Sequence, residues 1–133
     1  MNPKYVHHNQ NPTGRPRQET KDCVIRAISF ALGMDYYDVY DELSELAKEK
    51  TIPFNYELVT NEYLKNYPQI DEVYDDGARY QLNDVCDFND KKGTYIVQLS
   101  DHMVAVKDGK FYDQLDCGNR YCVNIWEIVD KEE

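Results

Sequence analysis

A cysteine, a histidine and an aspartate in this chain lie in local sequences that suit nucleophilic chemistry. Cys23 stands where the polar residues 20–22 give way to an apolar, helix-like segment. The unpaired N–H groups at a helix start favour a thiolate over a thiol. His102 opens an apolar, strand-like segment, and Asp113 lies in the next one. A thiol, an imidazole and a carboxylate in these settings predict a nucleophile with its base and orienting acid.

A tight turn is expected to bring the histidine and the aspartate together. The Asp-Gly dipeptide at 108–109 is typical of a two-residue hairpin turn. In that register Val104 faces Asp113, so Asp113 lies diagonally opposite His102 on the same face, within reach of the imidazole. Asp116 points to the other face. A one-residue bulge in the turn would exchange the two acids.

Each of the three residues has a defined role in this prediction. The Asp113 carboxylate accepts a hydrogen bond from one ring nitrogen of His102, fixes the tautomer and stabilises the imidazolium, and the other nitrogen meets Cys23. The oxyanion of a tetrahedral intermediate also needs donors. The backbone N–H of Cys23 is one candidate. The side-chain amide of Gln18, five residues upstream, is a second.

The same residues also have purely structural interpretations. A cysteine on an apolar helix is usually a small buried hydrophobe, which is the alternative for Cys23. His102 could be satisfied by Ser100 or Asp101, and Asp113 could cap a turn. These alternatives stay open at the level of the sequence.

The sequence predicts no metal site and no cofactor. Four cysteines and three histidines are present, but no Cys-x-x-Cys pair occurs, and Cys117 and Cys122 are five positions apart. We expect these two cysteines and Cys86 to be packing residues. His7 and His8 are expected to be solvated.

The expected elements give an α+β domain that spans residues 1–133. Residues 23–32 predict a buried helix with Asp22 or Thr20 as its cap and Gly33 as its stop. Further helices are predicted at 36–48, 60–66 and 82–88. Strands are predicted at 94–99, 102–107, 110–115 and 121–129, forming a C-terminal antiparallel sheet. Residues 1–21 predict an extended N-terminal arm.

Several of these segments together resemble small uncharacterised proteins of bacteriophages, prophages and Gram-positive bacteria, which look like compact papain-like cysteine peptidases. The shared segments are NPTGR at 11–15, DCVIRAI at 22–28, GTYIV at 93–97, HMVAV at 102–106, DG at 108–109 and YD at 112–113. The resemblance implies a papain-like fold with a nucleophilic cysteine on a central helix, and its catalytic roles map onto Cys23, His102 and Asp113. Gln18 departs from the pattern, because papain-type enzymes place the oxyanion glutamine six residues before the cysteine.

Composition and charge limit the kinds of molecule that the chain is expected to bind. The formal net charge of −10 repels phosphate backbones and argues against nucleic-acid binding. No apolar run approaches the roughly 18 residues needed to span a membrane, and the N-terminus lacks the apolar core of a secretion signal. We therefore expect a cytoplasmic protein, in the bacterial host if it is phage-encoded, with reduced cysteines.

The leading hypothesis is a cytosolic cysteine hydrolase that cleaves a peptide, isopeptide or related amide bond through an acyl-enzyme. Its substrate would be a peptide or a protein, with a host protein as one option, and deamidation or acyl transfer would use the same residues. The alternative is a non-catalytic binding protein of papain-like fold, for example a phage-encoded inhibitor of a host defence protein. Its contact surface would be acidic and rich in tyrosine, of which the chain has 12.

Overall fold

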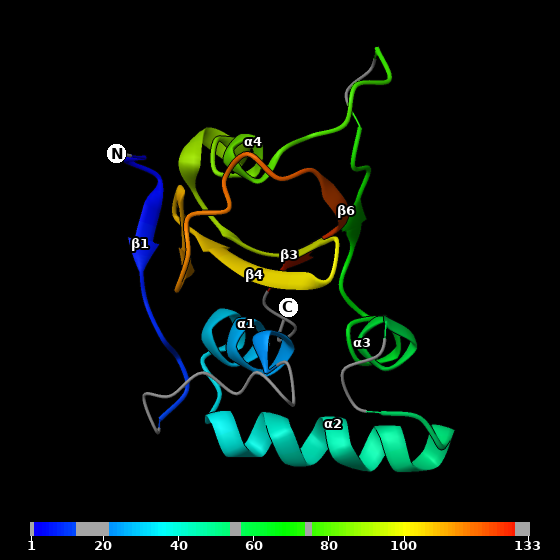
Figure 1. Ribbon diagram of the computed structural model, residues 1–133. Coiled ribbons are helices and arrows are strands. Elements are labelled where there is room, and N and C mark those ends of the chain that lie inside the picture. The colour runs from blue at the N-terminus through cyan, green and yellow to red at the C-terminus, as the bar shows by residue number, and fades with distance from the viewer. Residues whose placement is uncertain (1, 13–21, 54–56, 74–75, 130–133) are drawn as a thin grey trace.

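The computed structural model describes residues 2–12, 22–53, 57–73 and 76–129, and it has the predicted α+β class. The helices are α1 (Cys23–Leu32), α2 (Tyr36–Lys50), α3 (Glu57–Tyr63), α4 (Leu82–Val85) and the 3-10 helix η1 (Phe88–Lys91). The strands are β1 (Tyr5–His7), β2 (Gln69–Ile70), β3 (Thr94–Leu99), β4 (His102–Lys107), β5 (Lys110–Asp113) and β6 (Cys122–Ile128). Figure 1 shows α1, α2 and α3 on one side of the sheet and α4 on the other.

The helix α1 begins and ends where the sequence predicts. Gly33 ends it in the left-handed region, with a φ of 67°. Asp22 precedes it and supplies the first helical acceptor through its backbone carbonyl, which accepts from the Arg26 N–H at 2.9 Å. Asp22 is thus the N-cap residue, as predicted, although its side chain makes no capping hydrogen bond. The other predicted cap, Thr20, lies outside the described residues.

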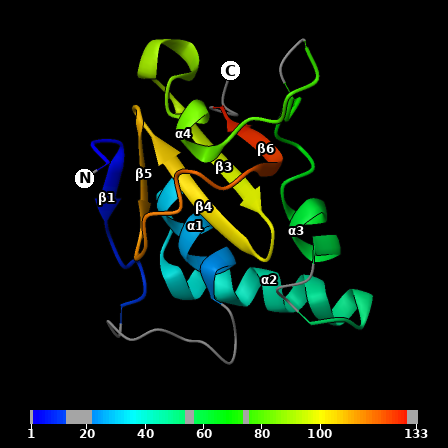
Figure 2. The ribbon, with the colours of Figure 1, turned by 45° about the horizontal axis from the view of Figure 1, so that its top comes forward.

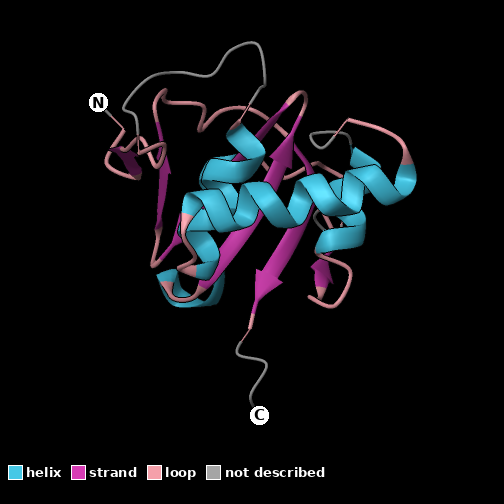
Figure 3. Cartoon of the chain, turned by 90° about the horizontal axis from the view of Figure 1, so that it is seen from below, coloured by secondary structure: helices cyan, strands magenta, loops and turns pink. Residues whose placement is uncertain are grey.

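The second helix, α2, has the cap that the sequence predicts. The side chain of Asp35 accepts hydrogen bonds from the N–H groups of Tyr37, at 2.9 Å, and Asp38, at 3.3 Å. Val39 and Leu43 are fully buried on the face that packs against α1. Seen from below the sheet, α1 and α2 lie across the strands (Figure 3).

The six strands lie in the order β1-β5-β4-β3-β6-β2. All neighbouring pairs are antiparallel except β1 and β5, which pair in parallel, with Tyr5 opposite Phe111 and His7 opposite Asp113. The four predicted C-terminal strands are antiparallel as expected, and the unpredicted β1 makes the whole sheet mixed. The predicted arm contributes the strand β1, which lies at the β5 edge of the sheet (Figure 2). The sequence does not predict this strand, because three residues are too few to show the alternation of apolar and polar residues that is typical of strands.

The turn between β4 and β5 confirms the predicted hairpin register. Asp108 and Gly109 both have positive φ values, 50° and 86°, as a two-residue turn of the mirror-image type requires. Ala105 then pairs with Tyr112, and Lys107 with Lys110. Because no bulge intervenes, the side chains of the two strands keep the faces that the sequence assigns to them.

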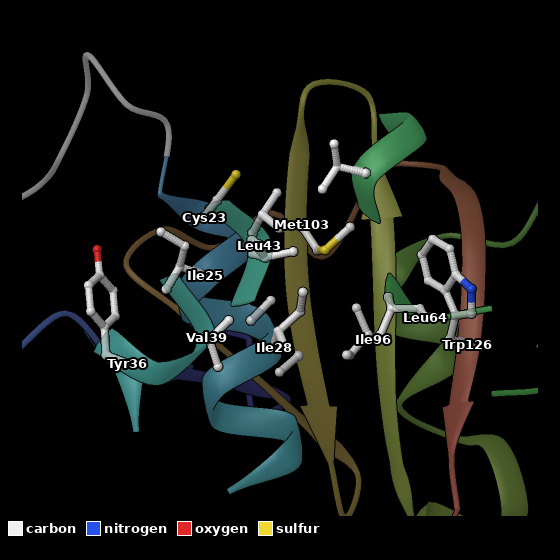
Figure 4. Packing of buried hydrophobic residues seen from close by; sticks show 14 of the residues in the cluster. Cys23, Ile25, Ile28, Tyr36, Val39, Leu43, Leu64, Ile96, Met103 and Trp126 are labelled. Carbon is white, nitrogen blue, oxygen red and sulfur yellow. The ribbon is translucent and has the colours of Figure 1, made fainter. Parts of the chain in front are cut away.

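Both faces of the sheet are covered, and β3 and β4 are buried on each side. Ile96 and Met103 pack with α1 and α2 in one apolar cluster, which Figure 4 shows from close by. Val97 and Val104 point the other way and pack in a second cluster with α4. By the same alternation His102, the first residue of β4, belongs to the second face and lies at the end of the sheet.

Three helix predictions and two strand predictions differ from the structure in their bounds, and α2 extends two residues beyond the predicted 36–48. The helix expected at 60–66 begins and ends three residues earlier, and the one expected at 82–88 divides into α4 and η1. The strands expected at 110–115 and 121–129 are shorter, at Lys110–Asp113 and Cys122–Ile128.

Among the described residues, no helix is both long and apolar enough to cross a membrane.

Candidate functional site

The end of the sheet brings the predicted histidine and aspartate into direct contact. The Nε2 atom of His102 lies 2.5 Å from Oδ2 of Asp113, with His102 at the start of β4 and Asp113 at the end of β5. The hairpin register thus brings Asp113, and not Asp116, to His102. Asp116 instead accepts hydrogen bonds from the Asn2 side chain, at 3.2 Å, and from the Gly118 N–H, at 3.1 Å.

The cysteine at the start of α1 lies near the same imidazole. The side chains of Cys117 and Cys23 both raise the pKa of the His102 ring. Because Asp113 occupies Nε2, Nδ1 is the ring nitrogen that remains for Cys23. Cys23 is 9 % exposed, and Figure 4 shows its sulfur at the edge of the apolar cluster, directed away from Ile28. The predicted imidazole and carboxylate are therefore in contact, and the predicted thiol lies near them.

The imidazole is held in its charged form. Burial lowers the pKa of His102, but the hydrogen bond to Asp113 and the contacts with the two cysteines outweigh it and raise the pKa to about 11. Near neutral pH His102 is therefore an imidazolium, and an imidazolium stabilises a thiolate beside it.

The carboxylate of Asp113 has a separate set of partners on each oxygen. Oδ1 accepts from the Gln114 N–H, at 2.8 Å, and from Arg26 Nη1, at 3.3 Å. Oδ2 faces His102. Burial raises the pKa of Asp113. The hydrogen bond and charge of His102 lower it, with help from Gln114 and Arg26, and the net pKa lies below that of an ordinary aspartate. Asp113 is therefore an ionised, firmly oriented carboxylate.

An arginine connects this carboxylate to the helix that carries the cysteine. The Nε of Arg26 donates to Oδ1 of Asp22 at 3.1 Å, while its Nη1 reaches Asp113. The other Asp22 oxygen accepts from the Asn11 amide, at 2.9 Å, and the Tyr36 hydroxyl, at 2.7 Å. This buried network fixes α1 relative to the end of β5. The sequence carried one signal of it, since Arg26 is the only charged residue in an otherwise apolar helix.

Cys117 is a member of the site that the sequence analysis assigned to packing. Its Sγ donates to Oδ2 of Asp113 at 3.5 Å, and its side chain is buried. Burial, the largest influence, raises the pKa of the Cys117 thiol. Cys117 lies in the irregular segment between β5 and β6, where no periodicity predicts which way a side chain points. A cleft of about 420 Å³ opens beside it and is lined in part by Asp116 and Arg120.

Of the two candidate oxyanion donors, one lies among the described residues. Cys23 is the first residue of α1, so its N–H is one of the four that have no partner within the helix. Gln18 lies outside the described residues. The backbone of Cys23 is therefore the donor that the described structure offers.

The other cysteines and histidines lie apart from this group. Cys86 and Cys122 are buried in the second apolar cluster, and burial raises the pKa of each thiol to about 12. His8 packs against Phe30 and bonds to Gln10, whereas the sequence analysis expected it to be solvated.

Comparison of the chain with protein-family models, with curated proteins and with solved structures found no match. Its function is therefore inferred from the site itself. A thiol at a helix start, a charged imidazole and an oriented carboxylate are suited to acyl chemistry on an electrophilic carbonyl carbon.

Proposed function

We propose that this protein is a cysteine hydrolase of papain-like fold that cleaves a peptide, isopeptide or related amide bond through an acyl-enzyme. The observation that supports it best is the imidazole of His102, which contacts Asp113 through Nε2 and whose pKa the nearby Cys23 side chain raises. The protein would work in the cytoplasm, on a peptide or protein substrate, without a cofactor.

In the proposed first step the sulfur of Cys23 attacks the carbonyl carbon of the substrate. The thiol proton resides on His102, so the attacking species is the thiolate of an ion pair. The C–S bond forms as the C=O π pair moves to oxygen, and the Cys23 N–H at the start of α1 donates to that oxyanion. The tetrahedral intermediate collapses, the C–N bond breaks, and His102 gives its proton to the leaving amine.

The second step returns the site to its starting state. A water molecule loses a proton to His102 and attacks the thioester carbon, and the C–S bond then breaks. The proton on His102 again pairs with the Cys23 thiolate, and the product is a carboxylic acid. Asp113 keeps the ring oriented throughout, because it holds Nε2 and leaves Nδ1 toward the sulfur.

A thiol-directed peptide probe tests this proposal. An activity probe with an electrophilic acyl warhead should label the wild-type chain once, at Cys23, and Cys23→Ala should abolish that labelling while its circular dichroism spectrum stays unchanged. Cys86→Ala is the matched control, because it removes another buried thiol, one that lies outside the site. Equal labelling of Cys23→Ala and wild type would contradict the proposal.

One surface feature supports the second candidate, a non-catalytic binding protein. The outer face of α2 has a shallow hollow around Leu46 whose rim carries Asp41, Glu42, Glu45 and Glu49. Four carboxylates around an apolar floor would suit a basic partner segment. If binding is the function, Cys23→Ala should retain full biological activity, and a charge-reversing Glu45→Lys variant should lose it.

A further inference from the structure

Three side chains with different metal-binding atoms converge at the end of the sheet. His102, Asp113 and Cys117 each place one nitrogen, oxygen or sulfur ligand atom within 4.8 Å of the other two. Two of the separations are 2.5 Å, from His102 Nε2 to Asp113 Oδ2, and 3.5 Å, from Cys117 Sγ to the same oxygen. Two of these side chains are buried and the third is partly buried.

The combination of imidazole, carboxylate and thiolate suits zinc. Tetrahedral zinc bonds nitrogen and oxygen at about 2.0–2.2 Å and sulfur at about 2.3 Å, so its ligand atoms lie about 3.2–3.8 Å apart. The sulfur–oxygen separation already falls in that range, and the nitrogen–oxygen separation would need to open by about 0.7–1 Å. Calcium and magnesium prefer sets made only of oxygen ligands.

The surroundings hold the carboxylate in the orientation that a metal ligand needs. Gln114 and Arg26 occupy Oδ1 of Asp113, which leaves Oδ2 directed at His102 and Cys117. Partners of this kind orient ligands in known zinc sites. The positive charge of Arg26 is offset by its ion pair with Asp22.

We propose that His102 Nε2, Asp113 Oδ2 and Cys117 Sγ form a zinc site with water as the fourth ligand, and that bound zinc inhibits the thiol site. On binding, the metal replaces the proton on Nε2 and the proton on the Cys117 sulfur, and both are released to solvent. The remaining ring proton then resides on Nδ1, where it faces Cys23. While zinc holds Nε2, His102 cannot be the imidazolium that pairs with the Cys23 thiolate, so Cys23 takes up a proton from solvent and its sulfur attacks more slowly.

The inhibitory part of this inference depends on the proposed function, whereas zinc binding does not. Cys117 is the residue that separates them, because it belongs to the metal site and not to the thiol mechanism. Cys86 provides a matched control, since it is a buried thiol outside both sites.

Zinc titration against a chromophoric chelator measures binding directly. We expect one zinc per wild-type chain. Cys117→Ser should weaken the affinity for zinc at least as much as loss of a residue that only supports a metal ligand, which costs about 10–100-fold. Cys86→Ser should leave the affinity unchanged. Equal zinc affinity of wild type and Cys117→Ser would overturn the proposed site.

Cobalt substitution on the wild-type chain tests the site without dependence on a variant that folds poorly. Co²⁺ should give a thiolate-to-metal charge-transfer band in the near ultraviolet, and this band should persist in Cys23→Ala. A wild-type chain without the band, or a band lost in Cys23→Ala, would overturn the ligand assignment.

Probe labelling in the presence of zinc tests the inhibition. Zinc should slow labelling of the wild-type chain and have little effect on Cys117→Ser at the same concentration. If wild type binds zinc and shows no labelling even when metal-free, the proposed function fails and the zinc site stands. If zinc binds and labelling is unchanged, the inhibitory role is wrong.

Discussion

The four cysteines form two pairs that are similarly buried and chemically different. Cys23 and Cys117 lie at the polar end of the sheet against the imidazole of His102. Cys86 and Cys122 lie in the apolar cluster that packs on α4, at 1 % and 0 % exposure. Burial alone makes a thiol harder to ionise, and a charged neighbour is needed to reverse that tendency. The first pair therefore has a charged neighbour, and the second pair has apolar surroundings.

The largest expected difference between the two pairs is in alkylation. With a pKa of about 12, Cys86 and Cys122 each have about one thiolate in ten thousand molecules at pH 8. We expect iodoacetamide to modify Cys23 first in the folded chain, as peptide mapping by mass spectrometry would show. Raising the pH should speed modification of Cys86 and Cys122 by up to about tenfold per unit, since their thiolate fraction rises in that proportion. Modification of Cys86 before Cys23 would show that the two pairs of cysteines do not differ in reactivity as expected.

Removing the imidazole should make Cys23 resemble the unreactive pair. We expect His102→Ala to slow labelling of Cys23 by an acyl probe by about 10²–10⁴-fold, the usual contribution of a positioned acid or base. The second-order labelling rate at pH 7 measures this effect. His7→Ala is the control, because it removes a histidine from β1 and leaves the site residues in place. A rate unchanged by His102→Ala would show that the contact is only structural.

A smaller effect, on stability, is expected from replacement of Arg26 at the polar end of the sheet. Arg26→Met keeps most of the side-chain volume but leaves the buried carboxylates of Asp22 and Asp113 without their shared cation. We expect the free energy of unfolding to fall by about 2–3 kcal/mol, as for the loss of hydrogen bonds to buried charges. Urea denaturation measures it. A loss below about 0.5 kcal/mol would show that the network adds little stability.

Local signals predicted the parts of the site that depend on short stretches of chain. The Asp-Gly turn at 108–109 set the register that brings His102 to Asp113, and Gly33 set the end of α1. Both depend on backbone preferences that a dipeptide or a single residue expresses. The α+β class followed from the change of period between the two halves of the chain.

Contacts between distant parts of the chain were not predictable in the same way. Arg26 meets Asp113 across 87 positions, and Cys117 reaches the site from an irregular segment. The side chain of Asp22 suited a helix cap in sequence, but in the structure Arg26, Asn11 and Tyr36 use its oxygens instead. Tertiary partners compete with local ones for a carboxylate, and sequence patterns show only the local partners.

The distribution of the site along the chain has a consequence during synthesis. The ribosome completes the thiol-bearing helix some eighty residues before it adds the hairpin with the imidazole, and the strand at residues 5–7 must wait for residues 111–113 before it can pair. Contacts of such sequence separation form slowly and late. A nascent chain that ends before residue 102 therefore carries the sulfur without its imidazole and carboxylate.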